Sequence, residues 1–206
     1  MNNRSETPAI KDQGKPLTFY IIANTITSGI MGGDLKICIE FARRWAKAGN
    51  NVTVITSEDG VSVCLGYGLP VHHLTVPSVR FRRLGRPMLY LIQALLTSIL
   101  AREIAKQPSA ILYSASNFWC DVFPAFWIKN RRKLCTWVGT SFLPILHPFK
   151  SLESSYEKGV WSWPNPKVFA LFLFQRISDL LLSKYADAIF VTNDLDKSAF
   201  IKAGVS

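Results

Sequence analysis

Short apolar segments of β type alternate with longer segments of helical pattern along most of this chain. Strands that alternate with helices pair in parallel and carry helices on both faces. The pattern therefore predicts an α/β fold with a doubly wound, mostly parallel, Rossmann-like sheet. The predicted strands are residues 17–23, 52–55, 61–65, 73–76, 110–114, 133–138 and 188–192. The predicted helices are residues 34–48, 87–106, 118–128 with an interruption at Pro124, 166–185 and 194–203.

Composition places these elements in one domain. The 206 residues are 49% hydrophobic, enough for a sizeable core, and we expect residues 17–206 to form the domain after a flexible tail at residues 1–16. The four cysteines are widely spaced without a CxxC pair, which predicts neither a metal site nor a disulfide framework. We see no apolar leader and no run of about 20 apolar residues, and therefore expect a cytoplasmic protein.

The loop after the first predicted strand is rich in glycine. Residues 28–33 read SGIMGG, and Asp34 opens the first predicted helix. Gly32 and Gly33 allow a ligand to approach the backbone closely, and the first N–H groups of a helix lack intrahelical partners. The loop therefore predicts an anion site, such as a site for phosphate. The alternative is a tight turn without a ligand, in which Asp34 only caps the helix.

Two common nucleotide-binding motifs do not match this loop. Its glycines run G-x-x-G-G, so the G-x-G-x-x-G fingerprint of dinucleotide folds is absent, and no G-K-[ST] follows as in a P-loop. Glu58 or Asp59 could still imitate the acidic residue that binds ribose in dinucleotide folds. This alternative is the less favoured one.

Several segments in order resemble the N-terminal domain of family 4 retaining glycosyltransferases. At the start of the chain these are SGIMGG, the helix DLKICIEFARRWAKAG at residues 34–49 and the strand NVTVIT at residues 51–56. Near the end they are KYADAIFVTN at residues 184–193 and FIKAGV at residues 200–205. The resemblance spans residues 17–205 and implies one half of a GT-B architecture, in which two Rossmann-like domains face each other.

The resemblance implies that this chain is the acceptor-side half of a hexosyltransferase. The C-terminal donor domain is then expected to be absent, through truncation or a split gene. The implied donor is a nucleotide sugar, the implied acceptor is a lipid-linked molecule or a glycan, and no metal or other cofactor is expected. Gly32 and Gly33 would face the donor diphosphate across the cleft.

The candidate catalytic groups follow from a departure from the family pattern. The family often carries a histidine just after the strand that matches residues 133–138, where this chain has Gly139, Thr140 and Ser141. Thr140 and Ser141 are therefore candidate hydroxyl contacts. His147 is a further candidate if its loop folds back, and an ordinary loop residue otherwise. In the mechanism proposed for the family, the departing phosphate can itself take the acceptor proton.

A polar segment follows the strand predicted at residues 110–114. Ser116 and Asn117 would lie at the same edge of the sheet as the glycine-rich loop, because parallel strands end together. They are candidates for binding acceptor hydroxyl groups. Asn117 could equally cap the next helix.

A basic cluster precedes the second predicted helix. Arg80, Arg82, Arg83 and Arg86 lie within seven residues, and an apolar helical segment follows directly. The net charge of +10 and the pI of about 9.6 favour acidic partners. Cations beside apolar residues favour an anionic membrane surface, which would place the protein at the inner face of the membrane. The alternative is a solvated basic loop before a core helix.

Three classes of function follow from these features. The first is the acceptor-side half of a glycosyltransferase. The second is a membrane-docking or interaction module without chemistry, left by truncation. The third, nucleic-acid binding, is not expected, because no module signature is present and an apolar helix, rather than stacking aromatics, follows the basic cluster.

Overall fold

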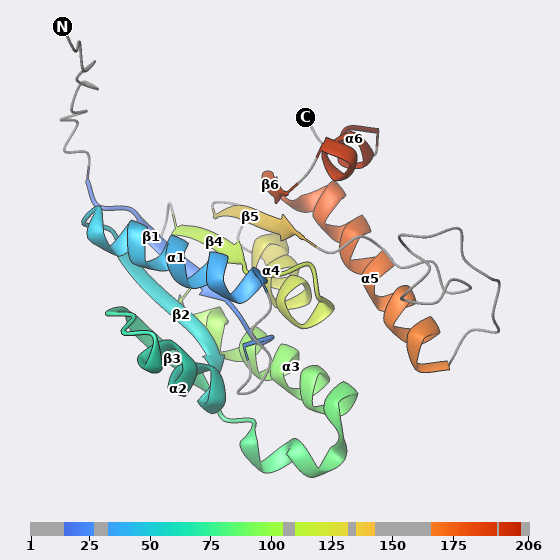
Figure 1. Cartoon of the computed structure of the whole chain (residues 1–206), viewed down its shortest axis with the longest axis horizontal. Helices are drawn as coiled ribbons and strands as arrows, with labels where there is room; N and C mark the ends of the chain where they lie inside the picture. The colour runs from blue at the N-terminus through green and yellow to red at the C-terminus, as the bar shows by residue number, and fades with distance from the viewer. Residues whose placement is uncertain are drawn as a thin grey trace, which may run out of the picture.

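The computed structural model shows a single parallel sheet covered by helices on both faces (Figure 1). It describes residues 15–26, 33–104, 110–131, 135–142, 166–192 and 194–202. The strands in this part of the chain are β1 (Thr18–Ile22), β2 (Asn51–Ser57), β3 (His72–Val76), β4 (Ala110–Ser114), β5 (Thr136–Ser141) and β6 (Ala188–Val191). Their order across the sheet is β3-β2-β1-β4-β5-β6, and every neighbouring pair is parallel. The α/β, Rossmann-like fold is therefore confirmed.

The helices of the described part follow the strands in alternation. They are α1 (Gly33–Lys47), α2 (Glu58–Gly66), α3 (Arg86–Ile104), α4 (Trp119–Arg131), α5 (Pro166–Tyr185) and α6 (Asp194–Lys202), with a short 3₁₀ helix η1 (Val79–Leu84) before α3. The prediction for α5 has the same bounds as the helix, and those for α1, α3 and α6 differ by no more than two residues at either end. The tail predicted at residues 1–16 falls mostly outside the described residues.

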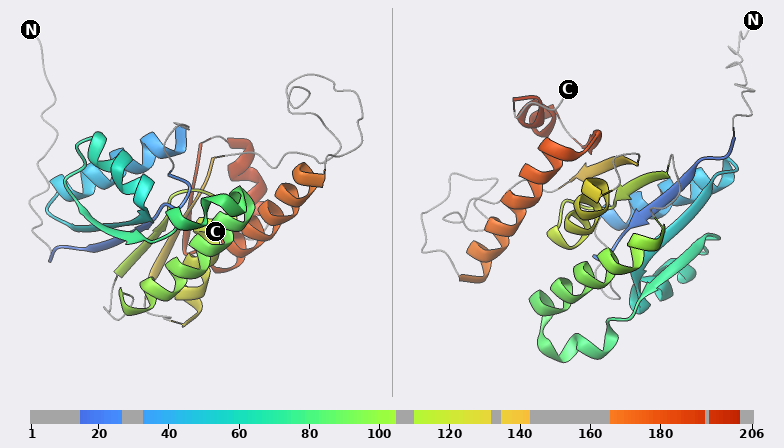
Figure 2. Two further views of the ribbon diagram at one scale, coloured as in Figure 1. Left: turned by 90° about the horizontal axis from the view of Figure 1, so that it is seen from below. Right: turned by 180° about the vertical axis from the view of Figure 1, so that it is seen from behind.

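Alternating side chains of the central strands enter two separate cores, one on each face of the sheet. Phe19 and Ile21 of β1 pack with α1 and α2. Tyr20 and Ile22 of the same strand pack with α3, α4 and α5 on the opposite face. Figure 2 shows these two helical layers on either side of the sheet. Burial on both faces explains why the strands read as continuous apolar runs.

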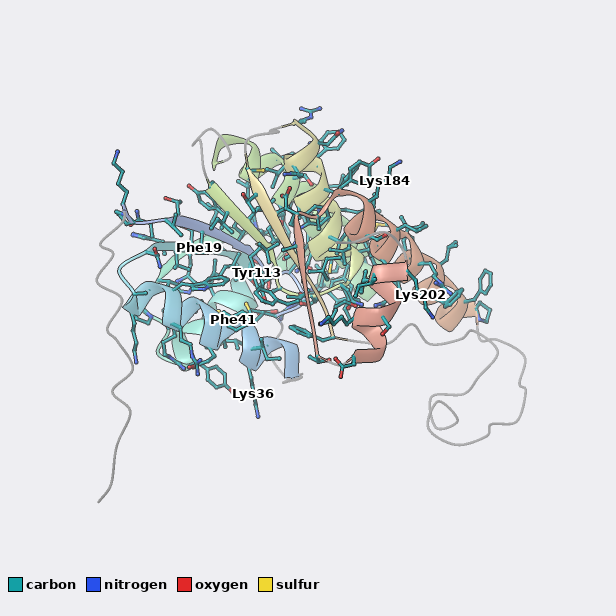
Figure 3. All side chains as sticks on the ribbon, turned by 90° about the horizontal axis from the view of Figure 1, so that it is seen from above. Phe19, Lys36, Phe41, Tyr113, Lys184 and Lys202 are labelled. Carbon is teal, nitrogen blue, oxygen red and sulfur yellow. The ribbon has the colours of Figure 1, made fainter. Side chains whose placement is uncertain are left out.

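Aromatic packing fixes α1 on its face of the sheet. The rings of Phe19 and Trp45 stack with 4.3 Å between centroids. Tyr113 of β4 meets Trp45 edge-on at 5.3 Å and Phe41 at 6.0 Å. Figure 3 shows Phe19, Phe41 and Tyr113 gathered between α1 and the sheet. This cluster sets the direction of α1 and so the position of its first residue, Gly33.

The strand predicted at residues 61–65 is wrong, because these residues belong to helix α2. Ser57 caps this helix by accepting a hydrogen bond from Gly60 N at 3.2 Å, and Glu58 and Asp59 lie in its first turn. Both features favour a helix N-terminus. The five-residue apolar run was too short to distinguish a strand from a helix.

Two further expectations need correction. Helix α4 continues past Pro124 to Arg131 without an interruption. Strand β5 begins and ends later than predicted, at Thr136 and Ser141. Gly139, Thr140 and Ser141 are therefore the last residues of a strand, where we expected the loop after it.

Gly139 lets α5 approach β5 closely, and Gly139→Ala should destabilise the fold. A Cβ at this position would clash with the Cδ2 atom of Leu182, whose side chain is fully buried. We expect a loss of about 1–3 kcal/mol in unfolding free energy, as for other overpacked cores. Urea titration measures it, with Gly66→Ala as the control because its Cβ would meet only open space. Equal stability of Gly139→Ala and wild type would contradict the close packing.

Candidate functional site

The strand order reverses between β1 and β4, the two central strands. From β1 the chain continues outward to β2, and β4 starts the other half of the sheet. The segments that leave the carboxyl ends of β1 and β4 therefore separate at this point, which is where doubly wound folds bind their ligands. Here the first segment begins at Ala23 and the second at Ala115, which is anchored by its N–H to Ile22 O at 2.9 Å.

Gly33 begins α1 at this edge of the sheet. The first N–H groups of α1 are thus the ones without intrahelical acceptors, and the helix dipole adds partial positive charge there. Gly32 lies outside the described residues. On the side facing the sheet, Ile26 packs in the same core as Leu35 and Ile39 of α1, so both ends of the glycine-rich loop are anchored in one cluster.

Asn24, the second residue after β1, makes three buried hydrogen bonds. Its side-chain Nδ2 donates to the carbonyl oxygen of Cys120 at 2.8 Å, and its backbone N–H donates to Asp121 Oδ1 at 2.7 Å. Its side-chain Oδ1 accepts from Thr97 Oγ1 at 3.1 Å. Asn24 therefore connects the end of β1 to both α3 and α4.

Asp121 collects donors from both sides of the reversal point. Besides Asn24 N, its carboxyl accepts from Thr25 Oγ1 at 3.0 Å and from Ser116 Oγ at 2.5 Å. The carboxyl is fully buried, and burial raises its pKa to about 7 although the hydrogen bonds act in the opposite direction. The carboxyl therefore holds its proton up to a higher pH than a solvent-exposed aspartic acid does.

The ends of β4 and β5 bring the other candidate residues together. Asn117 Nδ2 donates to Ser141 Oγ at 3.3 Å, and both side chains are buried. Thr140 Oγ1 donates to the carbonyl oxygen of Ser114 at 2.7 Å and is also buried. Ser116, besides bonding to Asp121, accepts from Phe118 N at 3.2 Å. Four candidate residues predicted from sequence thus lie at one edge of the sheet, and His147 falls outside the described residues.

The arginine cluster lies elsewhere, on η1 and at the first residue of α3. Arg80 and Arg83 are exposed, and the Arg80 guanidinium lies over the Phe81 ring, 4.8 Å from its centroid. Arg82 forms an ion pair with Asp59 of α2. The side chain of Arg86 is outside the described part of the structure. At least one of the four arginine charges counted in the sequence, that of Arg82, is therefore neutralised by a neighbouring carboxylate.

The acidic pair at the start of α2 holds η1 in place. Glu58 Oε2 accepts from the backbone N–H of Ser78 at 3.0 Å and from that of Val79 at 3.2 Å. Together with the Asp59 ion pair, these bonds turn both acidic side chains toward η1. They argue against the role of a ribose-binding acid for Glu58 or Asp59. Among the described residues, no three His, Cys, Asp or Glu side chains gather where they could hold a metal ion.

The structure adds Asn24, Thr97 and Asp121 to the site, none of which sequence reasoning selected as a site residue. One signal was present: Pro124 lacks an N–H, so the carbonyl four residues earlier, that of Cys120, loses its helical partner. That carbonyl needed another donor, and Asn24 supplies it. The identity of the donor could not be deduced, because Asn24 and Cys120 are 96 residues apart.

The sequence matches no family model, and no curated protein matches it. Among solved structures, the fold is similar to Alr3699/HepE of Anabaena in complex with UDP (17% identity, 92% of this chain, 41% of that chain, TM-score 0.47). It is also similar to MurG of Acinetobacter baumannii (12%, 61%, 35%, 0.38) and to a threonine deaminase of T.th. (14%, 88%, 63%, 0.27).

This chain spans less than half the length of HepE and of MurG. At such low identities the likeness concerns the fold alone. A function for the chain therefore has to rest on its own residues.

Asp121→Asn should remove a pH dependence of stability. Burial raises the pKa of this carboxyl from its usual 3.8 to about 7, so the folded state binds the proton more tightly than the unfolded chain. The resulting stabilisation is complete below about pH 4 and is lost as the pH rises through about 7. Across that window the wild type should lose up to about 4 kcal/mol relative to the variant, since one pKa unit is about 1.36 kcal/mol. Urea titrations between these pH values measure the difference, and parallel curves would contradict it.

Proposed function

We propose that this chain is the acceptor-side domain of a glycosyltransferase of GT-B architecture. The motifs resemble the retaining enzymes of family 4, so the proposed reaction moves a sugar from a nucleotide sugar to a lipid-linked or glycan acceptor. One observation carries the proposal: α1 begins at Gly33, after a glycine-rich loop, at the point where the strand order reverses. The acceptor-side role also rests on the resemblance of residues 184–205 to the end of the family's N-terminal domain.

The start of α1 suits a diphosphate for physical reasons. Its first N–H groups have no acceptor within the helix. Together with the helix dipole they stabilise negative charge, and Gly33 has no side chain to keep the phosphate away. The same groups stabilise the additional charge that develops on the leaving diphosphate when the bond to the sugar breaks. The net charge of +10 further favours an anionic ligand.

The ends of β4 and β5 suit the acceptor. Ser141 accepts a hydrogen bond from Asn117, and its own O–H can donate to a further partner, such as an acceptor hydroxyl. The only O–H of Thr140 is already given to Ser114, and we assign this residue to joining the two strands. In the proposed reaction the acceptor oxygen bonds to the sugar carbon, the bond to the diphosphate breaks, and the acceptor proton passes to the leaving phosphate.

The glycine-rich loop gives the first test. Gly33→Val should weaken binding of UDP, the probe, at least about tenfold, because the new side chain blocks close approach to the helix N-terminus. Gly66→Val is the matched control, since it places the same side chain at a helical glycine where a Cβ meets open space. NMR titration of the labelled chain with UDP, and separately with NAD, gives the affinities. Wild-type affinity in Gly33→Val, or binding of NAD alone, would contradict the proposal.

A membrane-binding surface is the second part of the proposal. Exposed apolar side chains at Met88, Leu91, Leu95 and Ile99 form a stripe along one face of α3, and Leu84 of η1 continues it. Arg80 and Arg83 are exposed beside its beginning. Apolar side chains with adjacent cations suit the surface of an anionic bilayer. None of the described helices has the length and hydropathy that a membrane span requires.

The alternative function, a docking module without chemistry, would use the same surface. It differs from the glycosyltransferase domain in one measurable property, because it needs no nucleotide. Membrane binding without any response to UDP would favour the docking module.

Replacing Arg80 and Arg83 with Ser should weaken binding to vesicles with anionic lipid about 30-fold, if each cation contributes about 1 kcal/mol. Arg82→Ser should have a smaller effect, because Asp59 already neutralises that charge. Leu95→Ser should also weaken binding, whereas the control Leu180→Ser changes a similarly exposed leucine on α5 and should not. Cosedimentation at low salt and at about 0.5 M salt, where screening is strong, separates the electrostatic contribution to binding from the apolar contribution. Unchanged binding of the double arginine variant would show that the cluster is only a solvated loop.

A further inference from the structure

We propose that Asp121 is a positioning residue that holds the start of the glycine-rich loop in place at the point where the strand order reverses. The inference rests on the proposed function for its consequence, the alignment of the first N–H groups of α1 toward a phosphate. Its structural part stands on the hydrogen bonds of Asp121 and Asn24 alone. Asp121 itself touches no proposed ligand.

The geometry assigns this role because the carboxyl oxygens bond to the two segments that leave β1 and β4. Asn24 and Thr25 follow β1, and Ser116 follows β4. A single side chain on the first turn of α4 thus ties both segments together. The bond from Asn24 N, at 2.7 Å, holds the backbone just after β1, from which the chain continues to the glycine-rich loop.

Pro124 completes the anchor. A proline in the interior of a helix leaves the carbonyl four residues earlier without its N–H partner, and such a buried carbonyl requires another donor. Here that carbonyl belongs to Cys120, and the side chain of Asn24 donates to it. Thr97 of α3 supplies the third contact, so Asn24 cannot move without breaking bonds to two helices.

The cost of burying the Asp121 carboxyl indicates that this side chain positions its neighbours rather than stabilises the fold. The carboxyl is fully buried, and among the described residues no cation forms an ion pair with it. The titratable groups that act on it or respond to its charge are the thiols of Cys38 on α1 and Cys120 on α4, whose pKa values burial raises, so both are neutral. A buried carboxyl without a countercharge costs folding free energy. The carboxyl instead holds its hydrogen-bond donors, Asn24 N, Thr25 Oγ1 and Ser116 Oγ, in a fixed arrangement.

The experiment compares amide hydrogen exchange in the labelled chain for wild type, Asp121→Ala, Asp121→Asn and a control. The control is Ile128→Val, which removes one buried methyl group near the far end of α4 and lowers stability without touching the site. In Asp121→Ala we expect exchange at Asn24 to accelerate at least about tenfold more than in the control, because a strong buried bond is lost. Asp121→Asn, which keeps one acceptor oxygen, should retain most of the protection.

A pH series tests the bond between Asn24 N and the Asp121 carboxyl directly. The Asn24 amide resonance should titrate with an apparent pKa near that of the carboxyl, about 7, in wild type and should not do so in Asp121→Asn. Acceleration at Asn24 equal to that in the Ile128→Val control would overturn the proposal. If Asp121→Ala does not fold, Thr97→Val removes one bond to Asn24 and leaves the carboxyl intact. Selective acceleration at Asn24 in that variant would support the anchor, and none would overturn it.

UDP titration separates this inference from the proposed function. If the inference and the function both hold, UDP shifts the Gly33 resonance in wild type, and Asp121→Ala weakens that response. If UDP leaves Gly33 unchanged in wild type, the proposed phosphate site is wrong, while the exchange data still decide whether Asp121 positions the loop.

Discussion

The parallel pairing of β1 with β4 is the constraint on which the rest of this domain depends. It joins two strands that are more than 85 residues apart in sequence and continues past the strand ends through the bond from Ala115 N to Ile22 O. Because both strands point the same way, the segments that follow them must leave from one edge. Every hydrogen bond at the candidate site, from Asn24 to Ser141, depends on that shared edge. The two apolar cores stabilise this pairing from opposite faces.

Periodicity in the sequence was sufficient to predict most of the fold. The long helices α1, α3 and α5 have clear limits, because Gly49 follows one, and Pro87 and Pro166 lie in the first turns of the others. Residues 61–65 were misassigned, since their apolar run fits either structure and the decisive contact, Ser57 with Gly60 N, is a local detail. Pro124 was expected to interrupt α4. The helix continues because a side chain from another part of the chain satisfies the carbonyl that the proline leaves free.

The sequence predicted where the candidate site lies in the fold, but not which hydrogen bonds its residues make. The edge of the sheet, Gly33, Ser116 and Asn117 followed from strand ends and turn residues, whereas Thr140 and Ser141 followed from the resemblance to the glycosyltransferase family. The partners of these residues did not, because they depend on contacts between distant segments. Ser116 bonds to Asp121 and to Phe118 N, which is closer to a capping role than to the predicted acceptor contact. In the same way, the charge of the arginine cluster could be counted from sequence, whereas the pairing of Arg82 with Asp59 required the fold.

Helix α3 connects the two surfaces of the proposed function. Thr97 points inward and donates to Asn24, whereas Leu95 and Ile99, two residues to either side, are exposed on the opposite face of the same turns. The exposed stripe and the loop anchor are therefore separated by about one helix diameter, roughly 10 Å. Under the proposed function, this arrangement would let an acceptor that is anchored in a bilayer by an apolar group present its polar group near the strand ends.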